Sequence, residues 1–192
     1  MNSTYQQALH LLNQVGDDTC LSFFNSFPSV EKLSIQPLSP SWLDICDCLS
    51  HVGSASSHTQ ALVETIVSNA PRQQWRQPYK IEDFGEDFYN KVAWFPIADA
   101  NGPLIFEQGL MEVMLLDANT EYPAHKHQPE ELYFVLAGKV WWKADGAKGS
   151  WKHAGEYIHH LPNVVHSIKA SDQPVLILSC WRGGGFEMPD IV

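Results

Sequence analysis

The sequence predicts a mainly β protein with an α-helical extension at its N-terminus. Over roughly the first 70 positions, apolar residues recur at the helical period of about 3.6 residues. After the turn dipeptide Asn101-Gly102, the chain becomes a series of strand-sized apolar runs separated by turns. Runs joined every ~8–12 residues are typical of an antiparallel sandwich or barrel. We therefore expect residues 1–72 to form a helical extension that packs on a β-barrel of residues 73–192.

Three helices are expected in the extension, over Tyr5–Leu12, residues 39–53 and residues 57–71. The second begins at a Ser-Pro pair that can cap and open a helix, and it places Trp42, Ile45 and Leu49 on one stripe. The third is ended by Pro71. Helices this short are unstable in isolation, so we expect them to pack against the barrel.

The barrel is expected to follow an aromatic segment, residues 75–95, that is broken by Pro and Gly and has no sustained period. Such a segment could cover the mouth of the barrel as a lid. The expected strands cover residues 104–108, 110–117, 130–138, 139–145, 155–161, 166–171 and 174–181.

Length and charge limit what the protein can bind. Its 192 residues suffice for one good core with a smaller appendage. The formal net charge is −10, and the 12 Lys and Arg residues are spread along the chain, whereas nucleic acid or an anionic membrane requires clustered basic residues. No apolar run approaches the ~18 residues that span a bilayer, and the N-terminus lacks the regions of a signal peptide. We expect a cytoplasmic protein that binds neither nucleic acid nor membrane.

One short stretch, EYPAHKHQPEELYFVLAG at residues 121–138, concentrates polar groups on a predicted strand. Residues two apart on a strand share a face, so His125 and His127 point the same way, as do Glu131 and Tyr133. The opposite face of the second pair is apolar: Leu132, Phe134 and Leu136. A polar inner face and an apolar outer face are what a small barrel that holds a ligand requires.

A third imidazole, His166, follows a turn in the stretch GEYIHHLPNVVHS. Imidazole and carboxylate donors suit Zn, Fe, Mn, Co or Ni, so we predict one divalent transition metal per chain. The alternative is a set of surface histidines near a loop, but six of the nine histidines fall between His125 and His166. His159 and His160 point to opposite faces, so at most one of them could enter the cavity.

The spacing His125-x-His127-x3-Glu131-x6-Gly138 resembles the first motif of the cupin family, and Gly155–His166 resembles the second. The resemblance implies a cupin fold, a double-stranded β-helix or jelly-roll barrel. Asn119 and Asn163 stand where the motifs have glycine, and asparagine tolerates the positive φ of such turns.

A finer pattern, Tyr122-Pro-Ala-His125-x-His127-x3-Glu131-x-Tyr133, is similar to the cupin-type dimethylsulfoniopropionate (DMSP) lyases. The resemblance implies that His127, Glu131 and His166 bind the metal, with Tyr133 as a fourth, exchangeable ligand or a near neighbour. It also places His125 and Tyr122 in the substrate pocket. Because the first histidine binds metal in many cupins, His125 is a candidate ligand as well.

The implied reaction is the β-elimination of DMSP to dimethyl sulfide and acrylate, the activity of a carbon–sulfur lyase. A base must remove the proton next to a carboxylate, and a metal-bound carboxylate carries the resulting charge more easily. Tyr133 is the expected base and Tyr122 the alternative, because a neighbouring cation favours the phenolate. Aromatic faces could hold the sulfonium, and Trp181 is one candidate among the aromatic residues of the strand region.

Two other functions fit the same ligand set. One is a different cupin enzyme, such as an Fe(II) dioxygenase or an isomerase, since ligands alone do not fix the chemistry. The other is a non-catalytic cupin that binds a small molecule. Exposed barrel edges also make a homodimer possible.

Overall fold

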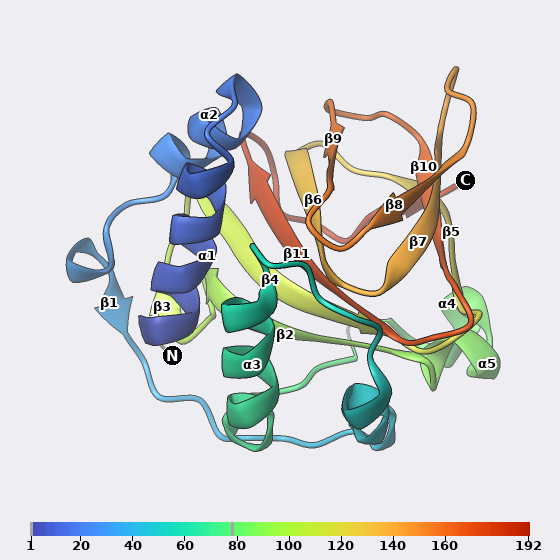
Figure 1. Ribbon diagram of the computed structural model, residues 1–192, viewed down its shortest axis with the longest axis horizontal. Coiled ribbons are helices and arrows are strands. Elements are labelled where there is room, and N and C mark those ends of the chain that lie inside the picture. The colour runs from blue at the N-terminus through green and yellow to red at the C-terminus, as the bar shows by residue number, and fades with distance from the viewer. Residues whose placement is uncertain (1, 78) are drawn as a thin grey trace.

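The computed structural model describes residues 2–77 and 79–192, and its strands form two sheets that face each other (Figure 1). The larger sheet has the order β1-β3-β2-β4-β11-β6-β9, and the smaller has the order β12-β5-β10-β7-β8. The strands of the larger sheet are β1 (Ser34–Ile35), β3 (Leu104–Ile105), β2 (Val92–Asp99), β4 (Gly109–Leu116), β11 (Val175–Arg182), β6 (Glu130–Ala137) and β9 (Tyr157–His160). Those of the smaller sheet are β12 (Asp190–Ile191), β5 (Glu121–Lys126), β10 (His166–Ala170), β7 (Lys139–Ala144) and β8 (Ser150–His153). All pairings except β2 with β3 are antiparallel, so the mainly β prediction is confirmed.

The two faces of β6 separate two hydrophobic cores, as its alternating sequence predicted. Leu132, Phe134 and Leu136 pack into the core shared with the N-terminal helices. Tyr133 and Val135 face the other core, which lies between the two sheets and includes residues of both. The barrel therefore has an interior lined partly by polar groups and an outer wall that is buried under helices.

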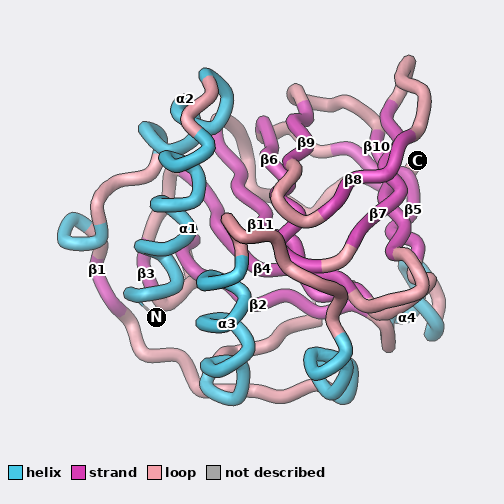
Figure 2. Tube along the Cα trace, in the orientation of Figure 1, coloured by secondary structure: helices cyan, strands magenta, loops and turns pink. Residues whose placement is uncertain are grey.

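Helices cover one outer face of the larger sheet (Figure 2). They are α1 (Asn2–Val15), α2 (Asp18–Ser26) and α3 (Gln60–Asn69), with the 3-10 helices η1 (Val30–Lys32), η2 (Asp44–His51) and η3 (Ala70–Arg72) between and after them. α1 contacts β2, α2 contacts β11 and α3 contacts β6, so the packing that short helices need is present. The division of the chain at residue 73 stays a prediction.

The expected helix over residues 39–53 is wrong in type and extent. Ser41 bridges Gln74 in an extended conformation, and only the 3-10 helix η2 follows. Ile45 and Leu49 are buried as predicted, but Trp42 precedes the helix and is 46% exposed. The apolar spacing predicted two of the three side chains correctly, but it was wrong about Trp42 and about the backbone conformation.

The aromatic segment after residue 75 packs against the barrel at β5. Its two short helices are α4 (Ile81–Phe84) and α5 (Glu86–Tyr89). The Tyr79 hydroxyl is hydrogen-bonded to the Tyr122 hydroxyl, and the Phe88 ring lies 5.5 Å from the Tyr122 ring. Pro78 lies outside the described residues. The segment thus covers Tyr122, and its movement as a lid stays a prediction.

Two asparagines adopt the backbone conformation that the sequence required of them. Asn119 has φ of 60° and Asn163 has φ of 62°, in the left-handed region where the cupin motifs have glycine. Among the described helices, none is long and apolar enough to cross a membrane.

Candidate metal centre

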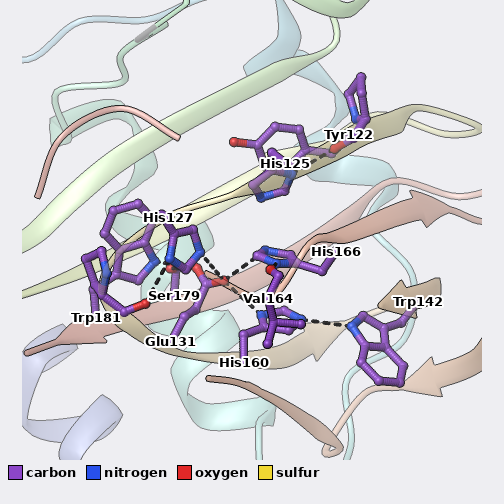
Figure 3. Close-up of polar contacts among 12 residues, drawn as sticks. Tyr122, His125, His127, Glu131, Trp142, His160, Val164, His166, Ser179 and Trp181 are labelled. Carbon is purple, nitrogen blue, oxygen red and sulfur yellow. Dashed lines mark hydrogen bonds and ion pairs between the residues drawn. The ribbon is translucent and has the colours of Figure 1, made fainter. Parts of the chain in front are cut away.

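Five acid and imidazole side chains from both sheets meet inside the barrel (Figure 3). His125 lies on β5, opposite His166 at the start of β10, in the smaller sheet. Glu131 on β6 lies opposite His160 at the end of β9, in the larger sheet. His127 follows β5 directly. All five are buried, so the strand pairing brings together groups that are far apart in sequence.

Three of the imidazoles have the same tautomer, because each is fixed by a backbone carbonyl two residues away. Nδ1 of His125 donates to Pro123 O at 2.7 Å, and Nδ1 of His166 donates to Val164 O at 2.9 Å. Nδ1 of His127 likewise donates to Pro129 O at 2.9 Å. A carbonyl only accepts, so the proton of each neutral ring is on Nδ1 and the lone pair is on Nε2.

One nitrogen from each of these three rings lies within 4.8 Å of the other two. The Nε2 atoms of His125 and His166 are buried without a hydrogen-bond partner among the described residues. Burial, and next to it the neighbouring His166, lowers the pKa of His125 to about 3, so its Nε2 lone pair stays free. Buried lone pairs without donors are costly, and a shared metal cation would satisfy them.

Glu131 is the acidic partner of the imidazoles. Its Oε2 lies 3.0 Å from Nε2 of His127 and 3.3 Å from Nε2 of His166. Burial alone would favour the protonated acid, but the hydrogen bonds of the imidazoles hold the pKa of Glu131 well below its usual range. The carboxylate is therefore ionised in the interior of the barrel.

The contact between His127 and Glu131 requires a positive charge between them. With Nδ1–H bound to Pro129, a neutral His127 would direct its Nε2 lone pair at a carboxylate oxygen. Burial opposes the imidazolium, but the Glu131 hydrogen bond raises the pKa of His127 above its usual value, so a proton can fill this place. A metal ion can replace such a proton, because metal ligands bind in their deprotonated forms. The donor set thus fits a divalent cation.

His160 differs from the other three histidines. The indole N–H of Trp142 donates to its Nε2 at 2.8 Å, and its Nδ1 lies 2.9 Å from Oε2 of Glu131. Burial lowers the pKa of His160, so the ring is neutral and carries one proton. Because Nε2 accepts from Trp142, that proton is on Nδ1 and is donated to Glu131. Although Glu131, His160 and His166 are close enough to share an ion, His160 has no lone pair left for it.

The two predicted bases, Tyr133 and Tyr122, occupy different surroundings. The Tyr133 ring lies 6.1 Å from the His166 ring and 5.4 Å from the His160 ring. Tyr122 stacks on His125 at 4.0 Å, and its hydroxyl is bonded to that of Tyr79. Burial first, and then nearby groups that include the Glu131 carboxylate, raise the pKa of both phenols well above 10.

Trp181 was predicted to hold the sulfonium, and it contacts the metal-centre residues. Its indole N–H donates to Oε1 of Glu131, and its ring stacks on His127 at 4.3 Å. Ser179 donates to the same oxygen at 3.0 Å. Trp181 and Ser179 therefore occupy Oε1 and leave Oε2 for the imidazole side of the site.

Sequence reasoning missed three residues of this site: Trp142, His160 and Ser179. The strand alternation allowed at most one histidine of the adjacent pair to face inward and could not say which. His159 is the outer one and bonds Glu130 at 2.6 Å. Ser179 carried no signal in the sequence, because an inward serine on an apolar strand resembles any small core residue.

One surface cleft lies away from these groups, and a smaller cavity adjoins one of them. The cleft of about 520 Å³ is lined by residues of η2 and by Gln77 and Tyr89, outside the barrel. A cavity of about 90 Å³ adjoins His166 and is lined by Ala124, Lys143, Ala144, Asp145, Val165 and Ser167. The five side chains of the candidate metal centre are buried.

The fold and the site define a cupin: two facing antiparallel sheets with imidazoles and a carboxylate converging inside. Within the cupins, the sequence profile of the dimethylsulfoniopropionate lyase family matches residues 37–177. The chain belongs to that family, and the resemblance inferred from its motifs is confirmed.

Two individual sequence relatives are consistent with this family assignment. DMSP lyase DddQ of Ruegeria pomeroyi is 25% identical over 178 residues, covering 92% of this chain and 85% of DddQ. A putative DMSP lyase, DddL of Cereibacter sphaeroides, is 30% identical over 127 residues, covering 65% of this chain and 52% of DddL.

Solved structures show the same fold. One described as that of the DMSP lyases RdDddP and RnDddQII matches with a TM-score of 0.82 at 28% identity, over 97% of this chain and 98% of the other. The crystal structure of DddQ from Ruegeria pomeroyi DSS-3 matches with a TM-score of 0.83 at 21% identity, over 100% and 98%.

Proposed function

We propose that this protein is a metal-dependent DMSP lyase that releases dimethyl sulfide and acrylate by β-elimination. The family membership supports the reaction. The observation that carries it is the convergence of three imidazoles, two of them with unpartnered Nε2 atoms, and an ionised carboxylate inside the barrel, with a phenol beside them.

The metal would be held by His127, Glu131 and His166, with Tyr133 as a fourth, exchangeable ligand or near neighbour and His125 as a further candidate. The lone pairs of the three rings and Oε2 of Glu131 support this assignment. A bound divalent cation would act as a Lewis acid toward the substrate carboxylate and would lower the pKa of a neighbouring phenol. Imidazole and carboxylate donors accept Zn, Fe, Mn, Co or Ni.

Tyr133 is the proposed base. Its oxygen takes the proton from the carbon next to the substrate carboxylate. The electron pair left behind forms the carbon–carbon double bond, the carbon–sulfur bond breaks, and dimethyl sulfide leaves with the sulfur electron pair. Tyr122 is the less favoured base, because its hydroxyl is already bonded to Tyr79 and its ring is stacked on His125.

The surroundings favour this chemistry in two further ways. Tyr122 and Tyr133 are 3% exposed, so bulk water has little access to the base. The segment that packs on Tyr122 adds Tyr79, Phe84 and Phe88, whose rings extend the apolar wall over β5. Exclusion of water strengthens the electrostatic interactions within the site.

The decisive experiment measures dimethyl sulfide in the headspace above metal-loaded protein and DMSP. Wild type should release it, and Tyr133→Phe should lose at least roughly a hundredfold in rate with its metal content unchanged. Tyr122→Phe is the matched control, and it should retain most of the activity. A Tyr133→Phe variant with full activity would show that the base is wrong, and a wild type without dimethyl sulfide release would show that the function is wrong.

A homodimer and a cytoplasmic location stay predictions of the same proposal. Size-exclusion chromatography with light scattering tests the first, and cell fractionation of the source organism tests the second.

A further inference from the structure

We propose that Glu112 forms a subsite for the cationic end of the substrate. The protein would then select propionates whose β-substituent carries a positive charge over those whose β-substituent is neutral. This inference rests on the proposed lyase function and adds a specificity-determining residue to it.

The strand register places Glu112 on the inner face of the barrel. Glu112 on β4 lies opposite Ser179 on β11, and Ser179 lies opposite Tyr133 on β6. Residues directly opposite one another on paired strands point to the same face of a sheet. Ser179 donates to Glu131, and Tyr133 is in the interior core, so Glu112 faces inward in the same row.

The neighbouring row of the sheet carries the metal centre. It consists of Leu110, Trp181, Glu131 and His160 on consecutive strands. Glu112 therefore lies in the row next to that of Glu131, the proposed ligand. It is in the same row as Tyr133, the proposed base, but two strands away, at about 10 Å. A substrate whose carboxylate points at the imidazoles and whose reacting carbon faces Tyr133 would extend its other end toward the Glu112 side of the barrel.

Glu112 has no protein partner for its charge among the residues described here. The nearby Arg76 lies 3.7 Å from the Asp99 carboxylate and makes its hydrogen bonds elsewhere. Burial, then the carboxylates of Asp99 and Glu131, raise the pKa of Glu112 to about 8, with Arg76 opposing them. A carboxyl in such a place is stabilised in its ionised form by a cation, and the one guanidinium found near it among the described residues, Arg76, is shared with Asp99.

The surroundings suit an organic cation better than a second metal. Glu112 is only partly buried, so it borders the solvent, and it does not belong to the groups that could share an ion. On the same inner face, Trp94 lies opposite Met114, two residues along β4 from Glu112. The Tyr79 ring lies 5.6 Å from the Trp94 ring. Aromatic faces beside a carboxylate attract a large, weakly hydrated cation such as a sulfonium.

The test compares two propionates of equal chain length that differ in the charge on sulfur: DMSP, a sulfonium, and 3-(methylthio)propionate, whose thioether sulfur is uncharged. Dissociation constants are measured by calorimetry on metal-loaded Tyr133→Phe protein, which should bind DMSP without turning it over, with and without Glu112→Gln. Glu112→Gln should weaken DMSP binding roughly tenfold or more and leave the thioether unchanged. The exposed Glu107→Gln is the matched control for loss of one negative charge, and Glu112→Asp should keep part of the preference.

Selective loss of DMSP binding would support the subsite. If Glu112→Gln leaves the ratio of the two dissociation constants unchanged, the subsite is overturned. This includes equal weakening of both ligands, which indicates a general disturbance of the site. If wild type releases no dimethyl sulfide although the Tyr133→Phe protein prefers DMSP through Glu112, the lyase function fails and the subsite stands. A chain that binds neither ligand overturns both.

Discussion

Trp142 fixes the protonation of His160, because its indole N–H donates to Nε2 of that ring at 2.8 Å. The ring then offers its only proton, on Nδ1, to Glu131 at 2.9 Å. His160 also stacks on His166 at 3.6 Å with the rings 15° apart. An indole on β7, in the smaller sheet, thus orients a carboxylate in the larger one.

Trp142→Phe should therefore weaken metal binding without removing a ligand. The His160 ring would lose the donor that fixes its tautomer, and the carboxylate of Glu131 would lose a fixed donor in turn. Loss of such supporting hydrogen bonds typically costs about 10–100-fold in metal affinity. Competition with a chelator measures the change. Trp141→Phe, the exposed neighbour on the same strand, should have no effect, and equal affinity of the two variants would contradict the role of Trp142.

Metal removal should lower the thermal stability of the wild type. A ligand that binds only the folded chain stabilises it by about 2.7 kcal/mol at 100 times its dissociation constant. Calorimetry before and after chelation should show a fall in Tm that added metal reverses. His166→Ala should abolish this response, because it removes a free Nε2 from the centre. The exposed His153→Ala should keep it.

Arg182 should attach helix α2 to the barrel. Its guanidinium contacts both carboxylate oxygens of Glu130, at 2.8 and 3.1 Å, and donates to the hydroxyls of Ser22 and Ser26. It also lies 4.0 Å from the Phe23 ring. Arg182→Met should destabilise the fold by about 1–3 kcal/mol in urea unfolding, and the exposed Arg72→Met should be nearly neutral.

The same variant tests a pH effect of known sign. The Arg182 hydrogen bond, and a further one from His159, lowers the pKa of Glu130 below 4.5. A depressed acid pKa stabilises the fold at neutral pH, and this contribution is lost as the pH falls below about 4.5 through the lower folded value. The difference in unfolding free energy between wild type and Arg182→Met should therefore become smaller at acidic pH. A difference that is independent of pH would contradict the pairing.

Much of the site could be predicted because its signals are local. The alternation of Glu131 and Tyr133 with Leu132 and Phe134 gave the inner and outer faces, and the structure confirms them. His160 could not be chosen over His159, because the choice depends on the register of β9 with β6, which is a long-range pairing.

The fold was predicted less completely where burial hides periodicity. Strand β2 has seven buried residues in succession, so its aromatic sequence showed no alternation and was assigned to the lid segment. The extended start of residues 39–53 is set by pairing of Ser41 with Gln74, which the sequence of that segment does not show.

Glu112→Gln should stabilise the protein at alkaline pH, which is a second consequence of placing an acid in the barrel. Burial, Asp99 and Glu131 raise its pKa to about 8, against 4.5 for an ordinary glutamate. Between these values the folded chain holds a proton that the unfolded chain has released, so stability falls as the pH rises through this window.

Glutamine has no such proton, so the variant should match wild type near pH 4.5 and exceed it above pH 8. Each unit of pKa shift corresponds to about 1.4 kcal/mol, and solvent screening of this partly exposed group reduces the total to about 1–2 kcal/mol. The charged and phenolic groups around it, Arg76, Asp99, Tyr79, Tyr133 and Glu131, are present in both proteins, so the comparison changes only the Glu112 carboxyl. Urea unfolding at pH 5 and pH 8.5 measures that difference. If the difference in unfolding free energy between Glu112→Gln and wild type is the same at pH 5 and pH 8.5, Glu112 is already ionised in the folded chain and the raised pKa is wrong.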